Sequence, residues 1–216
     1  MLTATTGSVI DLTLAYDQSI SGYQSRPARR LETDGWNADY LEIYSHAGTH
    51  MDAPLHFGLE TTIDQYDPNS LMGRAWVLSL SSVQPKQLIG VSDLGVLAEK
   101  IQAGDSLIIR TNWSQYLGQE KYRHELPRIS EELAHWLGNR KINMLGVEPP
   151  SVADVNNLAE VTLIHQILLG AKIKIVEGLC NLDQIRSDLV WMIALPLKIR
   201  GGDGAPCRVL ALEMPT

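Results

Sequence analysis

Apolar segments with helical and with strand-like spacing alternate through the second half of the chain. Ser92 predicts the N-cap of a helix that ends near Gly104, and Ser106–Arg110 (SLIIR) follows as a strand. The same order recurs as a helix at Ser130–Arg140 before a strand at Ile142–Val147, and as a helix at Leu158–Leu169 before a strand at Ile173–Val176. The last of these helices begins after Asn157 and closes at Gly170. Strands that alternate with helices in this way indicate an α/β domain.

The first half of the chain and its tail contain strand-like runs without intervening helices. These runs are Val9–Leu14, Leu41–His50, Ala75–Leu80, Val190–Ile199 and Arg208–Glu213. Ser21–Trp36 is polar and its apolar residues have no regular spacing, which predicts a long loop. The whole pattern predicts one α/β domain over residues 1–216, with a mixed sheet and flanking helices. A single domain is favoured because a chain of this length buries roughly 70% of its unfolded surface.

Composition narrows the class of partner. Hydrophobic residues make up 44% of the chain and charged residues 20%, as in ordinary globular proteins. The net charge is −7 and the basic residues are scattered, so nucleic acid is not expected as a partner. No apolar run approaches the roughly 18 residues of a membrane span, and Met1–Gly7 lacks the features of a signal peptide. We therefore expect a soluble cytoplasmic protein that acts on a small molecule.

The two cysteines, Cys180 and Cys207, do not form a CxxC pair. Free cysteine is among the most buried residue types, so we expect two small buried side chains in a reducing compartment. Any metal site in this chain must then use nitrogen and oxygen ligands.

Three of the six histidines fall within Ser45–His56. On an extended strand, His46, His50 and Asp52 leave the same face, since their numbers differ by even steps. Gly48 shares that face, and its missing side chain is expected to leave room for an ion. Imidazole and carboxylate together suit Zn²⁺, with Mn²⁺ as the alternative. A set of hydrogen-bonded surface histidines is the less favoured interpretation of this spacing.

His56 differs from the other histidines of the cluster. Pro54 interrupts the strand, so His56 need not share the face of His46 and His50. A histidine beside an ion can exchange protons with water or with a leaving group. The alternative, a fourth ligand, stays open.

The segment His46–Phe57 (HAGTHMDAPLHF) resembles the signature of the metal-dependent cyclase-like hydrolase family, which includes bacterial kynurenine formamidase and isatin hydrolase. The other segments that resemble this family are Val9–Thr13, Gly146–Val152, His165–Leu169 with Glu177–Leu179, and Leu195–Arg208. Two departures stand out. Glu148 and Pro149 replace the usual Asp and Thr, and Ser21–Trp36 lacks the Pro/Trp/Gly-rich stretch of the formamidases.

The resemblance implies the swivelling β/β/α fold, a homodimer and a set of site residues. It assigns metal binding to five side chains: His46, His50, Asp52, His165 and Glu177. It assigns proton transfer to His56. From the residues alone, His165 would be a core histidine and Glu177 a carboxylate at the end of a strand. Five ligands exceed the three of a typical one-metal catalytic site, so two ions that share carboxylates fit best, and a single ion is the alternative.

The reaction implied is hydrolysis of a non-peptide C–N bond in a small formamide or amide, by hydroxide that the metal activates. An aryl formamide such as N-formylkynurenine is the first substrate expected. Ring opening of isatin, a cyclic imide or a lactone is the alternative within the class. A metal- or ligand-binding protein without activity is the alternative outside it, and an intact His56 argues against it.

Residues around the site are less well defined by the sequence. Asp203 either orders the loop near the metal or is a plain turn residue. The aromatic residues considered for the substrate pocket are Trp36, Tyr23, Tyr66 and Trp113, each with a core or surface position as the alternative.

Overall fold

An eight-stranded sheet forms the centre of the computed structural model, which describes residues 7–80 and 82–213. Its strands are β1 (Val9–Asp11), β4 (His50–Asp52), β5 (Met72–Ser79), β7 (Ser106–Arg110), β9 (Met144–Val147), β10 (Lys174–Glu177), β11 (Leu189–Pro196) and β12 (Gly204–Glu213). Their order is β1-β12-β11-β5-β7-β9-β10-β4, and β4 also pairs with β12. All strands but β1 therefore form a closed ring. The neighbours from β5 to β10 are parallel and the other pairs antiparallel, which confirms the predicted mixed sheet.

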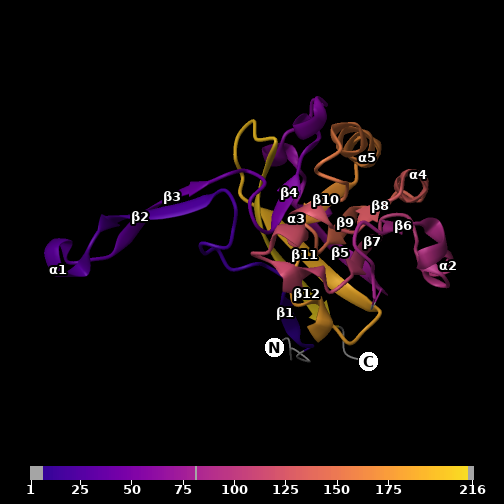
Figure 1. Cartoon of the computed structure of the whole chain (residues 1–216), viewed down its shortest axis with the longest axis horizontal. Helices are drawn as coiled ribbons and strands as arrows, with labels where there is room; N and C mark the ends of the chain where they lie inside the picture. The colour runs from indigo at the N-terminus through magenta and orange to yellow at the C-terminus, as the bar shows by residue number, and fades with distance from the viewer. Residues whose placement is uncertain (1–6, 81, 214–216) are drawn as a thin grey trace.

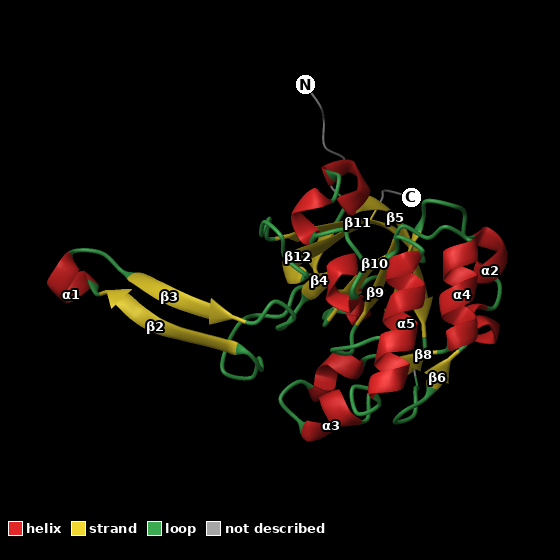
Figure 2. Ribbon diagram, turned by 90° about the horizontal axis from the view of Figure 1, so that it is seen from above, coloured by secondary structure: helices red, strands yellow, loops and turns green. Residues whose placement is uncertain are grey.

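Helices cover one side of this sheet, as Figure 2 shows for α2 (Leu97–Lys100), α4 (Glu131–Asn139) and α5 (Leu158–Gly170). Alternate residues of β7 face opposite sides: Leu107 and Ile109 pack toward the helices, and Ile108 packs into the other core. Burial on both faces explains why this strand is continuously apolar in the sequence.

The helix boundaries follow the capping residues. Ser130 accepts a hydrogen bond from the backbone of Leu133, and Asn157 caps α5 through the backbone of Glu160, as predicted. The helix expected from Ser92 to Gly104 is broken into a 3₁₀ turn (η4, Val91–Leu94) and α2. Gly95 lies between them with a φ of 50°, and a continuous right-handed helix does not contain a positive φ.

The prediction of a long loop over Ser21–Trp36 was wrong. That region folds into β2 (Tyr23–Arg29) and α1 (Leu31–Asp34), and β2 pairs with β3 (Ala38–Ile43). We call residues 23–43 the arm, because they project from the rest of the molecule (Figure 1). Most residues of both strands are exposed, so the polar and apolar positions show no alternation for sequence analysis to detect.

Further elements complete the described chain. A small parallel sheet joins β6 (Leu88–Ile89) to β8 (Arg128–Ile129), and α3 (Glu120–His124) lies between β7 and β8 in the sequence. In the described part of the chain, no helix has both the length and the apolar character needed to cross a bilayer.

The turn before β4 is held against the end of β10 by a close backbone approach. The Thr49 hydroxyl donates to the carbonyl of Gly178 and accepts from the backbone of Leu14 (2.8 Å). Gly178 has a φ of 69°, and a Cβ at this position would collide with the carbonyl oxygen of Gly48. This contact brings His50 opposite Glu177 in the register of β4 and β10.

Replacing Gly178 by alanine is expected to lower the free energy of unfolding by about 3 kcal/mol, since the new Cβ meets backbone and the φ is positive. Chemical denaturation of both proteins measures this loss. Gly170→Ala is the matched control, because a Cβ there meets nothing within 4 Å. Equal stability of Gly178→Ala and wild type would contradict the close approach.

Candidate metal centre

The five side chains predicted as ligands converge around β4. His50 and Asp52 lie on this strand, and Glu177 ends the neighbouring strand β10. His165 reaches the cluster from α5, and His46 from the turn that precedes β4. Residues more than 100 positions apart in the sequence thus meet at one end of the sheet.

Asp52 occupies the middle of the cluster. Its Oδ1 lies 2.8 Å from Nδ1 of His46 and 3.5 Å from Nε2 of His50. Its Oδ2 lies 3.6 Å from Nε2 of His165. Glu177 faces two of the same rings, with Oε2 at 3.1 Å from His50 Nε2 and Oε1 at 3.5 Å from His165 Nε2. Asp52 therefore faces His46 and His50 with Oδ1 and His165 with Oδ2.

The outer nitrogen of each of these three rings has a partner of its own. The three contacts are His50 Nδ1 to the carbonyl of Gly48 (2.9 Å), His165 Nδ1 to the carbonyl of Val161 (2.7 Å) and His46 Nε2 to Oδ2 of Asp203 (3.0 Å). A carbonyl accepts, so His50 and His165 donate N–H at Nδ1, which leaves Nε2 of each ring as the nitrogen that faces the carboxylates. Histidines that bind metals are typically held in this manner.

The cluster attracts positive charge. Burial lowers the pKa of His46, but hydrogen bonds and charges from Asp52 and Asp203 outweigh it and raise the pKa to about 9. Burial opposes protonation of His50 and His165 too, yet Glu177 and Asp52 raise the pKa of both. Burial raises the pKa of Glu177, and hydrogen bonds from the two histidines more than reverse this.

One buried oxygen shows that these residues fit a cation. Asp52 Oδ2 is inaccessible to solvent and has no hydrogen-bond partner among the described residues. A buried carboxylate oxygen without a partner is costly, and a divalent ion removes that cost. Two triplets have ligand atoms close enough to hold an ion, His46–Asp52–His56 and His50–Asp52–Glu177, and Asp52 belongs to both. The chemistry and spacing of these side chains therefore fit a divalent metal ion.

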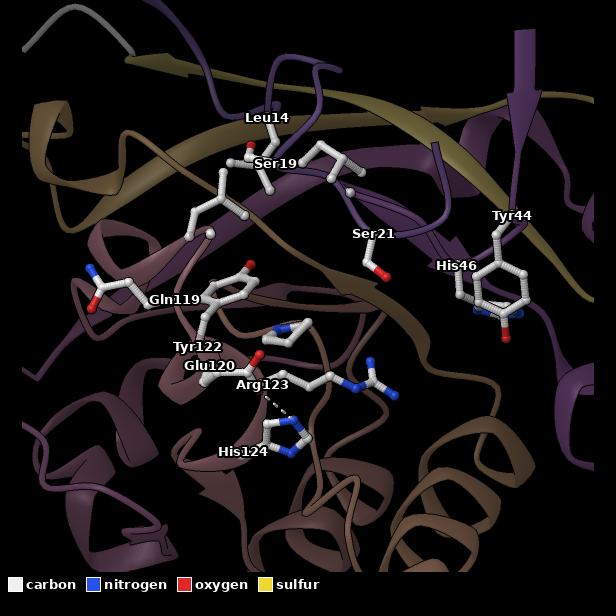
Figure 3. Close-up of a pocket in the computed structure, with 15 residues that line it drawn as sticks. Leu14, Ser19, Ser21, Tyr44, His46, Gln119, Glu120, Tyr122, Arg123 and His124 are labelled. Atoms are coloured by element: carbon white, nitrogen blue, oxygen red, sulfur yellow. Dashed lines mark ion pairs between the residues drawn. The ribbon is translucent and has the colours of Figure 1, made fainter. Parts of the chain in front are cut away.

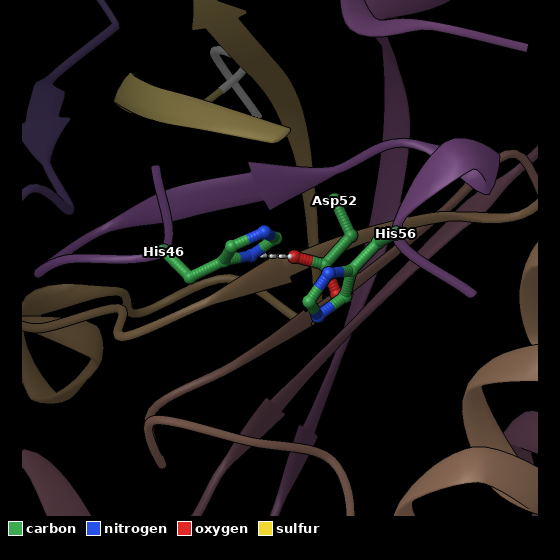
Figure 4. Close-up of side chains that lie close together, drawn as sticks. All are labelled: His46, Asp52 and His56. Carbon is green, nitrogen blue, oxygen red and sulfur yellow. Dashed lines mark hydrogen bonds and ion pairs between the residues drawn. The ribbon is translucent and has the colours of Figure 1, made fainter. Parts of the chain in front are cut away.

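His56 lies off the strand, as the position of Pro54 predicted: β4 ends at Asp52 and His56 belongs to a 3₁₀ turn (η1, Pro54–Phe57). Its ring stacks on His46 with centroids 3.8 Å apart, and Figure 4 shows both rings directed toward the Asp52 carboxylate. Its side chain is 26% exposed, against 2% for His50. Burial lowers the pKa of His56, and the Asp52 charge offsets this only in part.

The strand geometry expected for His46 and Gly48 was wrong. Both residues lie in a turn, so only His50 and Asp52 share a strand face. Gly48 has a φ of 60°, and a Cβ there would press on Tyr16. This glycine therefore shapes the turn and offers its carbonyl to His50, rather than making room for an ion.

Three further contacts support the cluster. Tyr66 donates its hydroxyl to the backbone carbonyl of Asp52 (3.0 Å), and the backbone of Val152 donates to Glu177 Oε1 (2.7 Å). Asp203 contacts His46 and also lies 3.5 Å from Nδ1 of His56, so it is more than a turn residue. The sequence gives no signal for the Tyr66 pairing, whereas Val152 and Asp203 both lie in segments that resemble the family.

A cavity of about 630 Å³ opens beside His46 (Figure 3). It lies between the segment around Leu14–Ser21, Tyr44 and the residues of α3. None of the four aromatic residues considered from the sequence lines it. Tyr66 instead donates its hydroxyl to the backbone carbonyl of Asp52, and Trp36 is exposed on the arm.

Comparison with known proteins gives consistent matches. Residues 10–154 match the model of the family described as Cyclase. The kynurenine formamidase of Erythrobacter litoralis is 30% identical over 182 residues, covering 83% of this chain and 78% of that protein. The kynurenine formamidase of Salinibacter ruber is 31% identical over 194 residues, covering 87% of this chain and 86% of that protein. Isatin hydrolase A from Ralstonia solanacearum superposes with a TM-score of 0.86 at 26% identity, over 96% of this chain and 92% of that one.

Replacing Asp203 by asparagine is expected to weaken Zn²⁺ binding by about 10- to 100-fold, since His46 loses a carboxylate partner at Nε2. The fold should persist, because the Asp203 side chain is 42% exposed. Competition with a chelating dye measures the affinity. Asp183→Asn, an exposed position outside the cluster, serves as the control. If both variants bind Zn²⁺ equally well, Asp203 does not position His46 for the ion.

Proposed function

Because the chain belongs to the cyclase family of hydrolases, we propose that it cleaves the C–N bond of a small formamide or amide. An aryl formamide such as N-formylkynurenine is the proposed substrate, on the strength of the kynurenine formamidases among its relatives. The main support for the proposal is the buried Asp52 carboxylate, which faces three histidines and has one oxygen without a hydrogen-bond partner among the described residues.

We propose His46, His50, Asp52, His165 and Glu177 as the metal ligands and Zn²⁺ as the ion, with Mn²⁺ as the alternative. Nitrogen and oxygen donors of this kind suit both ions. Two ions that share the carboxylate of Asp52 would explain why its two oxygens face different histidines. Two divalent ions bring +4 and the carboxylates of Asp52 and Glu177 bring −2, so +2 remains to stabilise an oxyanion.

A divalent ion held by these side chains would polarise a carbonyl oxygen and lower the pKa of a water molecule. His56 moves the proton. Its lowered pKa keeps the ring neutral near pH 7, so it can accept a proton and return it to the nitrogen that leaves. Asp203 lies against Nδ1 of His56 and orients the ring, and the partial exposure of His56 gives it access to substrate.

Ring opening of isatin, a cyclic imide or a lactone is the second candidate. The likeness to isatin hydrolase A favours it, since that structure covers nearly the whole chain. A panel of N-formylkynurenine, isatin, simple imides and aryl lactones, ranked by kcat/KM, separates the two. Best activity on a lactone with no amide cleaved would reject the C–N assignment.

Small molecules are the proposed partners, and we propose the cytoplasm as the location. Cys180 and Cys207 are both free, as is usual for proteins in a reducing compartment.

We also propose a homodimer in which a second copy covers the arm. Its exposed apolar side chains are Leu31, Trp36, Tyr40 and Leu41, each more than half exposed. A two-stranded sheet is at best marginally stable alone in water, and apolar surface of this kind is typical of interfaces.

Replacing His56 by alanine is expected to lower kcat on an aryl formamide by about 10²–10⁴-fold, since proton transfer by a positioned side chain contributes that much. Bound metal should stay at the wild-type level. An activated phenyl ester should lose less, because its leaving group needs no proton. Steady-state kinetics and elemental analysis of the same samples test this, with the surface variant His135→Ala as control. Metal lost in parallel with rate would make His56 a ligand.

Sedimentation equilibrium should give twice the mass of one chain, and Leu41→Asp should shift the mass toward a single chain. Leu41 is 61% exposed on the arm, so an added charge disturbs the interface without disturbing the core. Val96→Asp, equally apolar and 72% exposed but away from the arm, is the control. A monomeric wild type would exclude the proposed interface.

A further inference from the structure

The cavity beside His46 is far larger than a formamide group requires. Apolar and aromatic side chains form much of its wall, among them Leu14, Ile20, Leu117, Tyr44, Tyr122 and Pro150. Such a wall suits a flat apolar body that extends from the reacting bond. The part of a substrate that determines specificity would therefore lie in this cavity, beyond the metal ligands.

The charged groups of the cavity are not equivalent. Glu120 Oε2 lies 3.3 Å from Nε2 of His124, and Nδ1 of His124 lies 2.9 Å from the side-chain oxygen of Asn156. The side chain of Arg123, on the same helix, is exposed and forms no hydrogen bond or ion pair with any other residue that the structure describes. Its side chain extends across the hollow toward the side on which Tyr44 and His46 lie (Figure 3). One permanent cation is thus left without a partner inside the cavity.

A guanidinium in this position has a definite preference. Arginine stays charged at all relevant pH values and presents a planar fork of donors that matches a carboxylate. A neutral substrate would leave the guanidinium in water at no cost and gain nothing from it. An anionic substrate would gain charge-assisted hydrogen bonds, which are stronger than those between neutral groups.

We propose that Arg123 binds a carboxylate of the substrate while the reacting C–N bond lies at the His46 end of the cavity. The substrate class is then aryl formamides whose aryl body also carries a carboxylate. This assignment rests on the proposed hydrolysis of formamides. Arg123 takes no part in the chemistry, so its effect falls on substrate binding and on discrimination between substrates.

The test compares 2-formamidobenzoate with formanilide, which differ by the carboxylate, on Zn²⁺-loaded wild type, Arg123→Gln and Arg123→Lys. Arg123→Gln should lower kcat/KM on 2-formamidobenzoate by about 10- to 100-fold, mostly through KM, and leave formanilide unchanged. Arg123→Lys should keep part of the preference for 2-formamidobenzoate over formanilide, because lysine retains the charge but not the paired donors of the guanidinium. Lys121→Gln removes the same charge from the same helix outside the cavity, where its ammonium lies over Tyr116, and should change neither substrate.

Equal losses on both substrates, or no loss on either, would overturn the role of Arg123. Titration calorimetry with 2-aminobenzoate, the anionic product, tests the same contact without turnover. Weaker binding by Arg123→Gln supports the assignment, and unchanged binding rejects it. A wild type that hydrolyses neither formamide would instead overturn the proposed reaction, and the calorimetric result would still decide on Arg123.

Discussion

The burial of Asp52 and Glu177 among three imidazoles is the interaction on which the rest of this structure depends. Removing a carboxylate from water costs several kcal/mol unless a cation and hydrogen bonds compensate it. Asp52 is fully buried and Glu177 almost so, and neither contacts a lysine or arginine in the described residues. Protonated histidines provide some compensation, but Asp52 Oδ2 still has no hydrogen-bond partner among the described residues. The cluster is therefore organised for a charge greater than its own side chains supply.

The closed ring of strands is what makes this burial possible. β4 is only three residues long, yet it pairs with β10 on one side and with β12 on the other. Glu177 thereby lies opposite His50, and Gly204 opposite Asp52, which brings the neighbouring Asp203 to the outer face of His46. α5 packs against β10 and adds His165. The pairing of this short strand thus fixes the positions of His50, Asp52 and Glu177, and the 3₁₀ turn after it leaves the His56 side chain partly exposed.

Much of the regular core could be predicted from the sequence, because its signals are local. N-caps at Ser130 and Asn157 and the apolar run of β7 gave elements close to those observed. The arm could not be predicted, since both of its faces are exposed and no alternation exists to read. His46 was identified as a site residue but placed on a strand, because even spacing does not reveal the turn at Gly48. The outer partners are backbone carbonyls and Asp203, 157 residues from His46, and pairings of this kind depend on tertiary structure alone.

The central claim is that Asp52 is shared between two ions. An anomalous-difference map from crystals of the Zn²⁺-loaded protein, recorded on both sides of the zinc edge, tests this most directly. Two peaks are expected within coordination distance of the Asp52 carboxylate, one on the side of His46 and one on the side of His50, His165 and Glu177. A single peak, or two peaks of which only one contacts Asp52, would contradict the claim.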